Sequence, residues 1–312
     1  MSLAFVFPGQ GSQSLTMLSD LAVQFPEVQQ TFSEASDALG YDLWNLVANG
    51  PVEDLNQTDK TQPAMLAAGI AVWRCWQKTS DIKPDYFAGH SLGEYTALVA
   101  AGALDFSDAI KLVAQRGQFM QQAVPAGQGA MAAVLGLDDD TVRAVCDEAA
   151  ALGVVEAVNY NSPGQVVIAG SADAVNKAIE LAKEKGAKRA LLLPVSVPSH
   201  CALMKPAAEN LTSAMANISV QAPHIPVLHN VSVTSSTNSD EIKSLLAQQL
   251  HNPVRWVETI QFLAEQGVDK LVECGPGKVL AGLTKRIDKS VVAYPVLDPS
   301  TLEKAVQALG EA

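Results

Sequence analysis

The chain has 312 residues, of which 48% are hydrophobic, and it carries a net charge of −12 at pH 7 with an isoelectric point near 4.8. This length accommodates two folding units, or one large domain with an insertion. The acidic balance argues against general nucleic-acid binding, and no apolar run reaches the roughly 18 residues that a membrane-spanning helix needs.

The N-terminal part reads as a strand, a glycine-rich loop and then helices. Residues 3–7 form a predicted buried strand, which ends at the loop PGQGSQ of residues 8–13. Such a loop brings backbone amides close to a ligand, yet it has neither dinucleotide-binding nor P-loop spacing. The pattern then predicts helices over residues 17–48, interrupted by a proline, and over residues 64–78, with a loop over residues 56–63 between them.

The hexapeptide GHSLGE, residues 89–94, lies between a predicted strand (residues 85–88) and a predicted helix. In that context a G-x-S-x-G pattern indicates a nucleophile elbow, which exposes the serine hydroxyl on a sharp turn. The flanking glycines leave room where a Cβ would collide with the neighbouring backbone. The pattern therefore predicts Ser91 as a nucleophile, with the amide of Leu92 pointing at a developing oxyanion.

The segment of residues 127–196 differs from the rest of the chain in the order of its predicted elements. Strand-like and helical stretches follow one another there as β-α-β-β-α-β over about 70 residues, an order that defines the ferredoxin-like motif. On both sides of the segment, strands alternate with helices, which predicts a parallel sheet. We therefore expect an α/β fold: an α/β-hydrolase-like core of residues 1–126 and 197–312, with residues 127–196 inserted as a small subdomain.

A serine nucleophile needs a base, and two histidines are candidates. His90 is adjacent to Ser91, and adjacent side chains in a tight turn diverge. His200 follows Pro198 and Ser199 at a loop-helix junction and comes after the serine, as in α/β-hydrolases. His200 is therefore the expected base, although no acidic partner for it stands out in the sequence.

The four cysteines and five histidines lack the spacing of a metal site or a disulfide framework. We therefore expect chemistry without a metal. Cys201, beside His200, reads as a small core residue. The N-terminus has no basic segment of the kind that opens a signal peptide, so the expected location is the cytoplasm.

Four separated motifs together resemble one family. They are FPGQGSQ at residues 7–13, GHSLGE at residues 89–94, Arg116 on a predicted helix over residues 106–123, and the Pro-Ser-His run ending at His200. In this order and spacing they are similar to the malonyl-CoA:acyl carrier protein transacylases of type II fatty acid synthesis, and the similarity runs over essentially the whole chain.

The resemblance implies a role for each matching residue. Ser91 would carry the malonyl group as an ester and His200 would be the base. The amides of Gln10 and Leu92 would form the oxyanion hole, and Arg116 would bind the malonyl carboxylate. A backbone carbonyl at the position of Gln249 would orient the histidine in place of an acid. Because that contact uses the main chain, the side chain at this position is expected to carry little information.

The implied activity is transfer of malonyl from malonyl-CoA to the phosphopantetheine thiol of acyl carrier protein. The partners would then be coenzyme A thioesters and acyl carrier protein, with the enzyme a monomer. Three alternatives remain open at this point. A serine esterase or thioesterase would pass the acyl group to water, a polyketide-type acyltransferase would accept methylmalonyl units, and an inactive scaffold would only bind the carrier.

Overall fold

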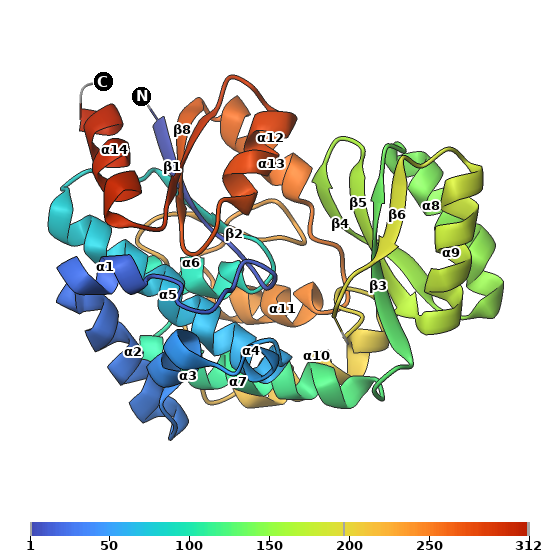
Figure 1. Cartoon of the computed structure of the whole chain (residues 1–312), viewed down its shortest axis with the longest axis horizontal. Coiled ribbons are helices and arrows are strands. Elements are labelled where there is room, and N and C mark those ends of the chain that lie inside the picture. The colour runs from blue at the N-terminus through green and yellow to red at the C-terminus, as the bar shows by residue number, and fades with distance from the viewer. Residues whose placement is uncertain (1, 196, 311–312) are drawn as a thin grey trace.

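A computed structural model describes residues 2–195 and 197–310, which form two lobes around two separate sheets (Figure 1). The larger lobe holds a five-stranded sheet in the order β7-β2-β1-β8-β9, and the smaller holds a four-stranded sheet in the order β4-β5-β3-β6. Both ends of the chain lie on the larger lobe, away from the smaller one (Figure 1). The smaller lobe therefore projects from one side of the larger.

Every strand pair in the larger sheet is parallel, which confirms the predicted parallel core. Its strands are β1 (Ser2–Phe7), β2 (Tyr86–Gly89), β7 (Val227–Leu228), β8 (Val268–Cys274) and β9 (Val292–Val296). The pairing of Phe7 with Gly89 brings the carboxyl ends of β1 and β2 to the same edge of the sheet. The glycine-rich loop and the hexapeptide, which follow those two strands, therefore lie next to each other.

Helices cover both faces of this sheet, and the side chains of β1 alternate accordingly. Phe5 and Phe7 belong to a core shared with α5 (Thr58–Thr79), α6 (Gly93–Ala100) and α7 (Phe106–Ala123). Ala4 and Val6 point the other way, into a core with α12 (Trp256–Glu265) and α13 (Val279–Ile287). Successive residues of a strand face opposite sides of its sheet, so a strand covered on both faces is apolar throughout.

The remaining helices of the larger lobe are mostly short. They are α1 (Ser19–Gln24), α2 (Pro26–Leu39), α3 (Leu43–Asn49), α4 (Val52–Leu55), α10 (Lys205–Met215), α11 (Ser239–Gln249) and α14 (Pro299–Gly310), with a 3₁₀ turn over Ala202–Met204. The break between α1 and α2 falls at Pro26, as predicted, because proline is accepted at the first position of a helix and not in its interior.

The smaller lobe follows the predicted order of elements. It runs β3 (Gly129–Leu135), α8 (Asp139–Ala149), a 3₁₀ turn (Ala150–Leu152), β4 (Val155–Ser162), β5 (Gln165–Ser171), α9 (Ala172–Glu184) and β6 (Arg189–Leu192). Its strand pairs are all antiparallel, and a core of its own lies between this sheet and the two helices.

One local prediction was wrong. Residues 56–63 are not a loop: α5 begins at Thr58 and contains Pro63, because this stretch is buried and tertiary packing outweighs its polar composition. The N-cap of α7 is Asp105, whose side chain accepts from the amide of Asp108. The strand β7 is limited to two residues.

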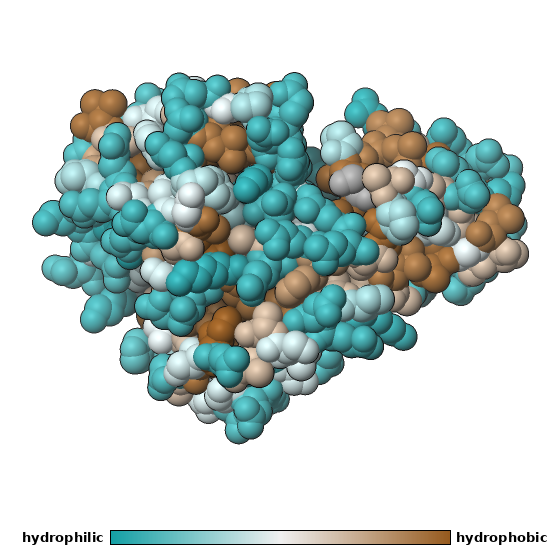
Figure 2. Space-filling view, turned by 90° about the horizontal axis from the view of Figure 1, so that it is seen from below, coloured by the Kyte–Doolittle hydropathy of each residue, from teal (hydrophilic) through white to brown (hydrophobic). Residues whose placement is uncertain are grey.

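The surface is largely hydrophilic over the larger lobe, while apolar side chains gather on the smaller lobe, at the right of the view (Figure 2). Exposed large hydrophobic residues of that lobe include Leu152, Leu191 and Leu192. Within the described ranges, no helix is both long and apolar enough to cross a membrane.

Candidate active site

The hexapeptide forms a sharp turn from β2 into α6, with Ser91 in the left-handed backbone region at φ 52°. The two flanking glycines are required by close approach of the backbone. A Cβ on Gly89 would lie 1.9 Å from the carbonyl of Gly93, and one on Gly93 would lie 2.0 Å from the carbonyl oxygen of Phe7. The turn therefore has the tight geometry that the sequence pattern predicts for a nucleophile elbow.

The structure brings His200 to the serine from a loop more than a hundred residues away. Ser91 Oγ lies 2.7 Å from His200 Nε2, and His200 Nδ1 lies 2.7 Å from the main-chain oxygen of Gln249. A carbonyl oxygen can only accept, so Nδ1 carries the proton and Nε2 presents its lone pair to the hydroxyl. The Ser91–His200–Gln249 chain is thus arranged for proton transfer from the serine.

The imidazole of His200 is held in its neutral form. Burial, followed by the positive charge of Arg116, lowers the pKa of His200 to about 3. The residue has a left-handed backbone, at φ 68°, and its amide donates to the carbonyl of Leu250. A neutral, fixed imidazole is the form that a general base requires.

Arg116 is buried on α7 with its guanidinium beside the same cavity. Its two terminal nitrogens donate to amide oxygens, Gln62 Oε1 at 2.8 Å and Gln249 Oε1 at 2.9 Å, and its Nε has no partner among the described residues. Burial lowers the pKa of Arg116. No carboxylate of the described residues forms an ion pair with it. A buried cation held only by neutral groups can accept an anionic ligand.

The two amides expected to form an oxyanion hole both line this cavity. The glycine-rich loop supplies Gln10 and the start of α6 supplies Leu92. Neither main-chain amide takes part in a hydrogen bond within the parts of the chain that the structure describes. Two free N–H groups beside Ser91 can donate to a developing negative charge.

The cavity has a volume of about 210 Å³ and lies between the two lobes. The larger lobe provides the serine, histidine and arginine, and the smaller lobe contributes both apolar side chains and the polar side chains of Asn159, Asn161 and Gln165. His90 faces these polar groups, with its Nε2 2.8 Å from Asn161 Oδ1, and within the described part of the chain no side-chain hydrogen bond joins it to Ser91. The side chain of His90 therefore diverges from the serine, as predicted.

The side chain of Gln249 is more informative than the sequence suggested. Its Oε1 accepts from Arg116, while its Nε2 donates to the main-chain oxygen of Ser91 at 3.0 Å and to Glu94 Oε2 at 2.7 Å. The expectation that this side chain carries little information was wrong, because only its main-chain contact had been considered. One residue thus contacts His200, the backbone of Ser91 and Arg116.

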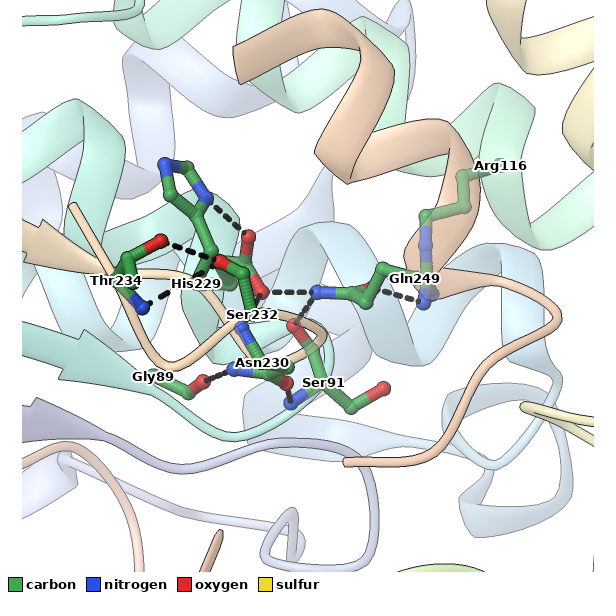
Figure 3. A network of polar contacts seen from close by, with 9 residues as sticks. Gly89, Ser91, Arg116, His229, Asn230, Ser232, Thr234 and Gln249 are labelled. Carbon is green, nitrogen blue, oxygen red and sulfur yellow. Dashed lines mark hydrogen bonds and ion pairs between the residues drawn. The ribbon is translucent and has the colours of Figure 1, made fainter. Parts of the chain in front are cut away.

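A buried polar network beneath the elbow was also missed (Figure 3). The carboxylate of Glu94 accepts from His229 Nδ1 at 2.7 Å and from the amide of Asn230 at 3.0 Å. The side chain of Asn230 in turn accepts from the amide of Ser91 at 2.7 Å and donates to the oxygen of Gly89 at 2.7 Å. The available signal in the sequence was Glu94, the acidic residue that ends GHSLGE. The structure shows that its side chain is fully buried.

The described residues hold no cluster of three or more histidine, cysteine or acidic side chains that could bind a metal. All four cysteines are free and buried. Burial raises the pKa of Cys201 to about 12, and its Sγ contacts the oxygen of Pro198 at 3.1 Å. A thiol that stays protonated is a poor nucleophile, so Cys201 behaves as a packed core residue.

Comparison with known proteins finds similarity over nearly the full length. The model of the acyl transferase domain family matches residues 4–298. The chain is 56% identical to the malonyl CoA-acyl carrier protein transacylase of Escherichia coli K12 over 97% of this chain and 98% of that protein. It is 48% identical to the Bacillus subtilis protein of the same name, over 99% and 98%.

Solved structures agree with the sequence comparison. An acyl carrier protein S-malonyltransferase from Vibrio cholerae superposes with a TM-score of 0.95 at 59% identity, over 97% of this chain and 99% of that one. A malonyl-transacylase in complex with a type II polyketide acyl carrier protein gives 0.97 at 55%, over 99% and 100%.

Proposed function

This chain belongs to the malonyl CoA-acyl carrier protein transacylase family of acyl transferases, and we propose that it transfers malonyl through an ester on Ser91. The protein is an acyltransferase that moves malonyl from malonyl-CoA to acyl carrier protein, for fatty acid synthesis. The observation that carries the proposed route is the Ser91–His200–Gln249 chain, with its two 2.7 Å contacts, in the cavity that also holds Arg116.

In the first half-reaction Ser91 Oγ attacks the thioester carbonyl carbon while His200 Nε2 takes the hydroxyl proton. The tetrahedral oxyanion is bound by the amides of Gln10 and Leu92, each of which typically contributes about 3–4 kcal/mol to such a state. The carbon–sulfur bond then breaks, and coenzyme A leaves with the proton that His200 held. The product is a malonyl ester on Ser91.

The second half-reaction runs the same steps in the opposite sense. The phosphopantetheine thiol of the carrier gives its proton to His200, and its sulfur attacks the ester carbonyl. The carbon–oxygen bond to Ser91 breaks, and Ser91 recovers the proton. Only acyl and proton transfers occur, with no change of oxidation state, so we propose that the enzyme needs no metal or redox cofactor.

Arg116 would select acyl groups that carry a free carboxylate. Its guanidinium offers two parallel donors in a buried setting, a geometry that matches a carboxylate. An acetyl group has no carboxylate and would leave the cation without a counter-ion. The same argument admits methylmalonyl, so the polyketide-type extender is distinguished only by competition between the two thioesters.

We propose acyl carrier protein as the partner, as in the related malonyl-transacylase that was solved with its carrier. We also propose that the enzyme acts as a monomer in the cytoplasm. For the fold, we propose an α/β-hydrolase-like large subdomain of residues 1–126 and 197–312 and a ferredoxin-like small subdomain of residues 127–196. The antiparallel order β4-β5-β3-β6, reached through β3-α8-β4-β5-α9-β6, supports the second assignment.

The test is to follow labelled malonyl from malonyl-CoA with holo carrier protein, with apo carrier protein and with buffer alone. A transferase places label on the holo carrier, leaves the apo form unlabelled, and releases malonate slowly. Release of malonate at the same rate with and without the carrier would show a hydrolase instead. Transfer that survives in Ser91→Ala would exclude the ester on Ser91.

A further inference from the structure

Glu94 is a fully buried carboxylate on the first turn of α6, three residues after Ser91. A buried charge is costly unless hydrogen bonds compensate it. Glu94 receives three: from His229 Nδ1, from the amide of Asn230 and from Gln249 Nε2. The last two groups can only donate, so the carboxylate acts as their acceptor. None of the steps proposed above uses this group.

The contact with Gln249 decides which way that side-chain amide points. Its Nε2 lies 2.7 Å from Glu94 Oε2, and this leaves Oε1 facing the NH2 group of Arg116 at 2.9 Å. In the flipped orientation the amide NH₂ would face the guanidinium donors, and the amide oxygen would face the carboxylate. Both contacts would then be repulsive. Glu94, together with the main-chain oxygen of Ser91, therefore selects the orientation in which Gln249 can hold Arg116.

Gln249 also fixes the base and the nucleophile. Its main-chain oxygen accepts from His200 Nδ1, and its Nε2 donates to the main-chain oxygen of Ser91. A shift of Gln249 would move the imidazole and the guanidinium together, because both are held by one residue. Misplacement by about 1 Å can slow an enzymatic step by about 100-fold.

We propose that Glu94 is a positioning residue for acyl transfer: it anchors the side chain of Gln249, which holds His200 and Arg116 in register with Ser91. The proposal rests on the proposed transfer through Ser91. Two other roles for Glu94 make different predictions. As a mere counter-charge it would weaken carboxylate binding at Arg116, and as a purely structural group it would affect folding alone.

The test compares Glu94→Gln, Glu94→Asp and Gln249→Met with the wild-type enzyme. For each protein, the rate of Ser91 acylation is measured with malonyl-CoA and with acetyl-CoA, together with the melting temperature. The readout is the malonyl-over-acetyl ratio, because instability alone slows both reactions equally. Glu273→Gln is the matched control: Glu273 is also fully buried, and it accepts from the amides of Leu280 and Ala281 without contacting Gln249.

Glu94→Gln keeps an oxygen that can still accept from Gln249 Nε2, so its ratio should stay near that of the wild type. In Glu94→Asp the carboxylate is drawn back from Gln249, and we expect malonyl transfer to fall by about 10- to 100-fold. Acetyl transfer falls less, because it depends on His200 and not on Arg116, so the ratio falls. Glu94→Asp retains the charge and withdraws the carboxylate by one methylene, so a counter-charge role predicts an unchanged ratio there. It predicts a raised ratio in Glu94→Gln. Glu273→Gln should keep the wild-type ratio.

The double variant Glu94→Asp with Gln249→Met tests the route of the effect. If Glu94 acts through Gln249, adding Glu94→Asp to Gln249→Met leaves the ratio where Gln249→Met alone puts it. Additive losses, a wild-type ratio in folded Glu94→Asp, or a raised ratio in Glu94→Gln would overturn the proposal. Should Glu94→Asp fail to fold, Glu94→Ala takes its place in the cycle. A wild-type enzyme that never acylates Ser91 would instead refute the proposed function and this inference with it.

Discussion

Two strand-to-helix turns at the same edge of the parallel sheet both contain residues with positive φ, and they accommodate these angles in different ways. The elbow joins β2 to α6 and places Ser91 at φ 52°, whereas the turn from β8 to α13 places Gly275 at φ 143° and Gly277 at φ 81°. Glycine adopts such angles freely, while other L-residues in the left-handed region lose about 1–2 kcal/mol. Only the elbow carries a side chain at its strained position.

The elbow compensates this strain with hydrogen bonds from distant residues. Asn230 accepts from the amide of Ser91, and Gln249 donates to its oxygen. The turn after β8 has a simpler support, in which the carboxylate of Glu273 accepts from the first amides of α13. A turn that must display a hydroxyl thus needs a buried network, whereas a turn that only redirects the chain needs glycine.

The largest expected effect separates chemistry from strain at Ser91. Ser91→Ala and Ser91→Gly should both lower transfer by on the order of 10⁴-fold or more, since the nucleophile is gone. Ser91→Gly should also be more stable than Ser91→Ala by about 0.5–1 kcal/mol, because glycine relieves a backbone strain that alanine retains. It should therefore unfold at a higher temperature. Equal melting temperatures for the two variants would show that the elbow stores no strain.

The next effect concerns the selectivity for malonyl over acetyl that Arg116 would give to the cavity beside the elbow. Arg116→Ala should lower malonyl transfer by about 100-fold or more, because it removes two charge-assisted hydrogen bonds to the carboxylate, each worth about 1.5–3 kcal/mol, and about 1.4 kcal/mol is a factor of ten. Acetyl transfer should fall much less. Steady-state rates with the two thioesters measure this, and Arg116→Lys serves as the control that keeps the charge without the paired donors. Equal losses with both substrates would exclude a selective role.

The pH dependence should reveal the electrostatics of the base. His200 must be neutral to act, and with its pKa lowered to about 3 it remains so far below pH 6.5. The rate of Ser91 acetylation by acetyl-CoA is measured as a function of pH. Its acid limb, the fall in rate as His200 becomes protonated, should therefore lie near pH 3. In Arg116→Ala that limb should move upward, because a neighbouring positive charge has been removed. An unmoved limb would mean that Arg116 does not influence His200.

The same shift affects stability in a defined direction. Below pH 6.5 the unfolded chain protonates His200, while the native state does not until about pH 3. The contribution of His200 to stability is thus present above pH 6.5 and is lost as the pH falls through this window. Denaturant titrations at pH 7 and pH 5 should show lower stability at pH 5, with a smaller difference in His200→Gln.

At the other turn the expected effect is on stability and not on transfer. Gly275→Ala should destabilise the fold by about 1–3 kcal/mol, because alanine is strained at that backbone angle. Its Cβ would also lie 2.9 Å from the ring of Pro8. Thermal melts measure the change, and Gly186→Ala is a control, at a positive φ with no atom within 4 Å of the added Cβ. If Gly275→Ala loses no more stability than the control does, backbone strain accounts for the whole loss and the approach to Pro8 contributes nothing.

The sequence predicted the elements whose patterns are local. The elbow around Ser91 follows from a strand, two glycines and a helix, and the parallel core follows from alternating elements. His200 was expected as the base from its place after the serine, whereas the role of Arg116 required the family resemblance, since a helix arginine has no local signature. Glu94 was missed because its partner Gln249 is 155 residues away, and a sequence pattern does not give such contacts. Gln62 was missed because its helix was taken for a loop.

The most direct test of this account is the mass of the intact protein after brief exposure to malonyl-CoA, followed by peptide mapping. We expect one malonyl adduct, located on Ser91 and absent from Ser91→Ala. Holo carrier protein should discharge it faster than buffer does. An adduct on another residue, or none, would contradict transfer through the elbow, and discharge by buffer at the same rate would contradict transfer to the carrier.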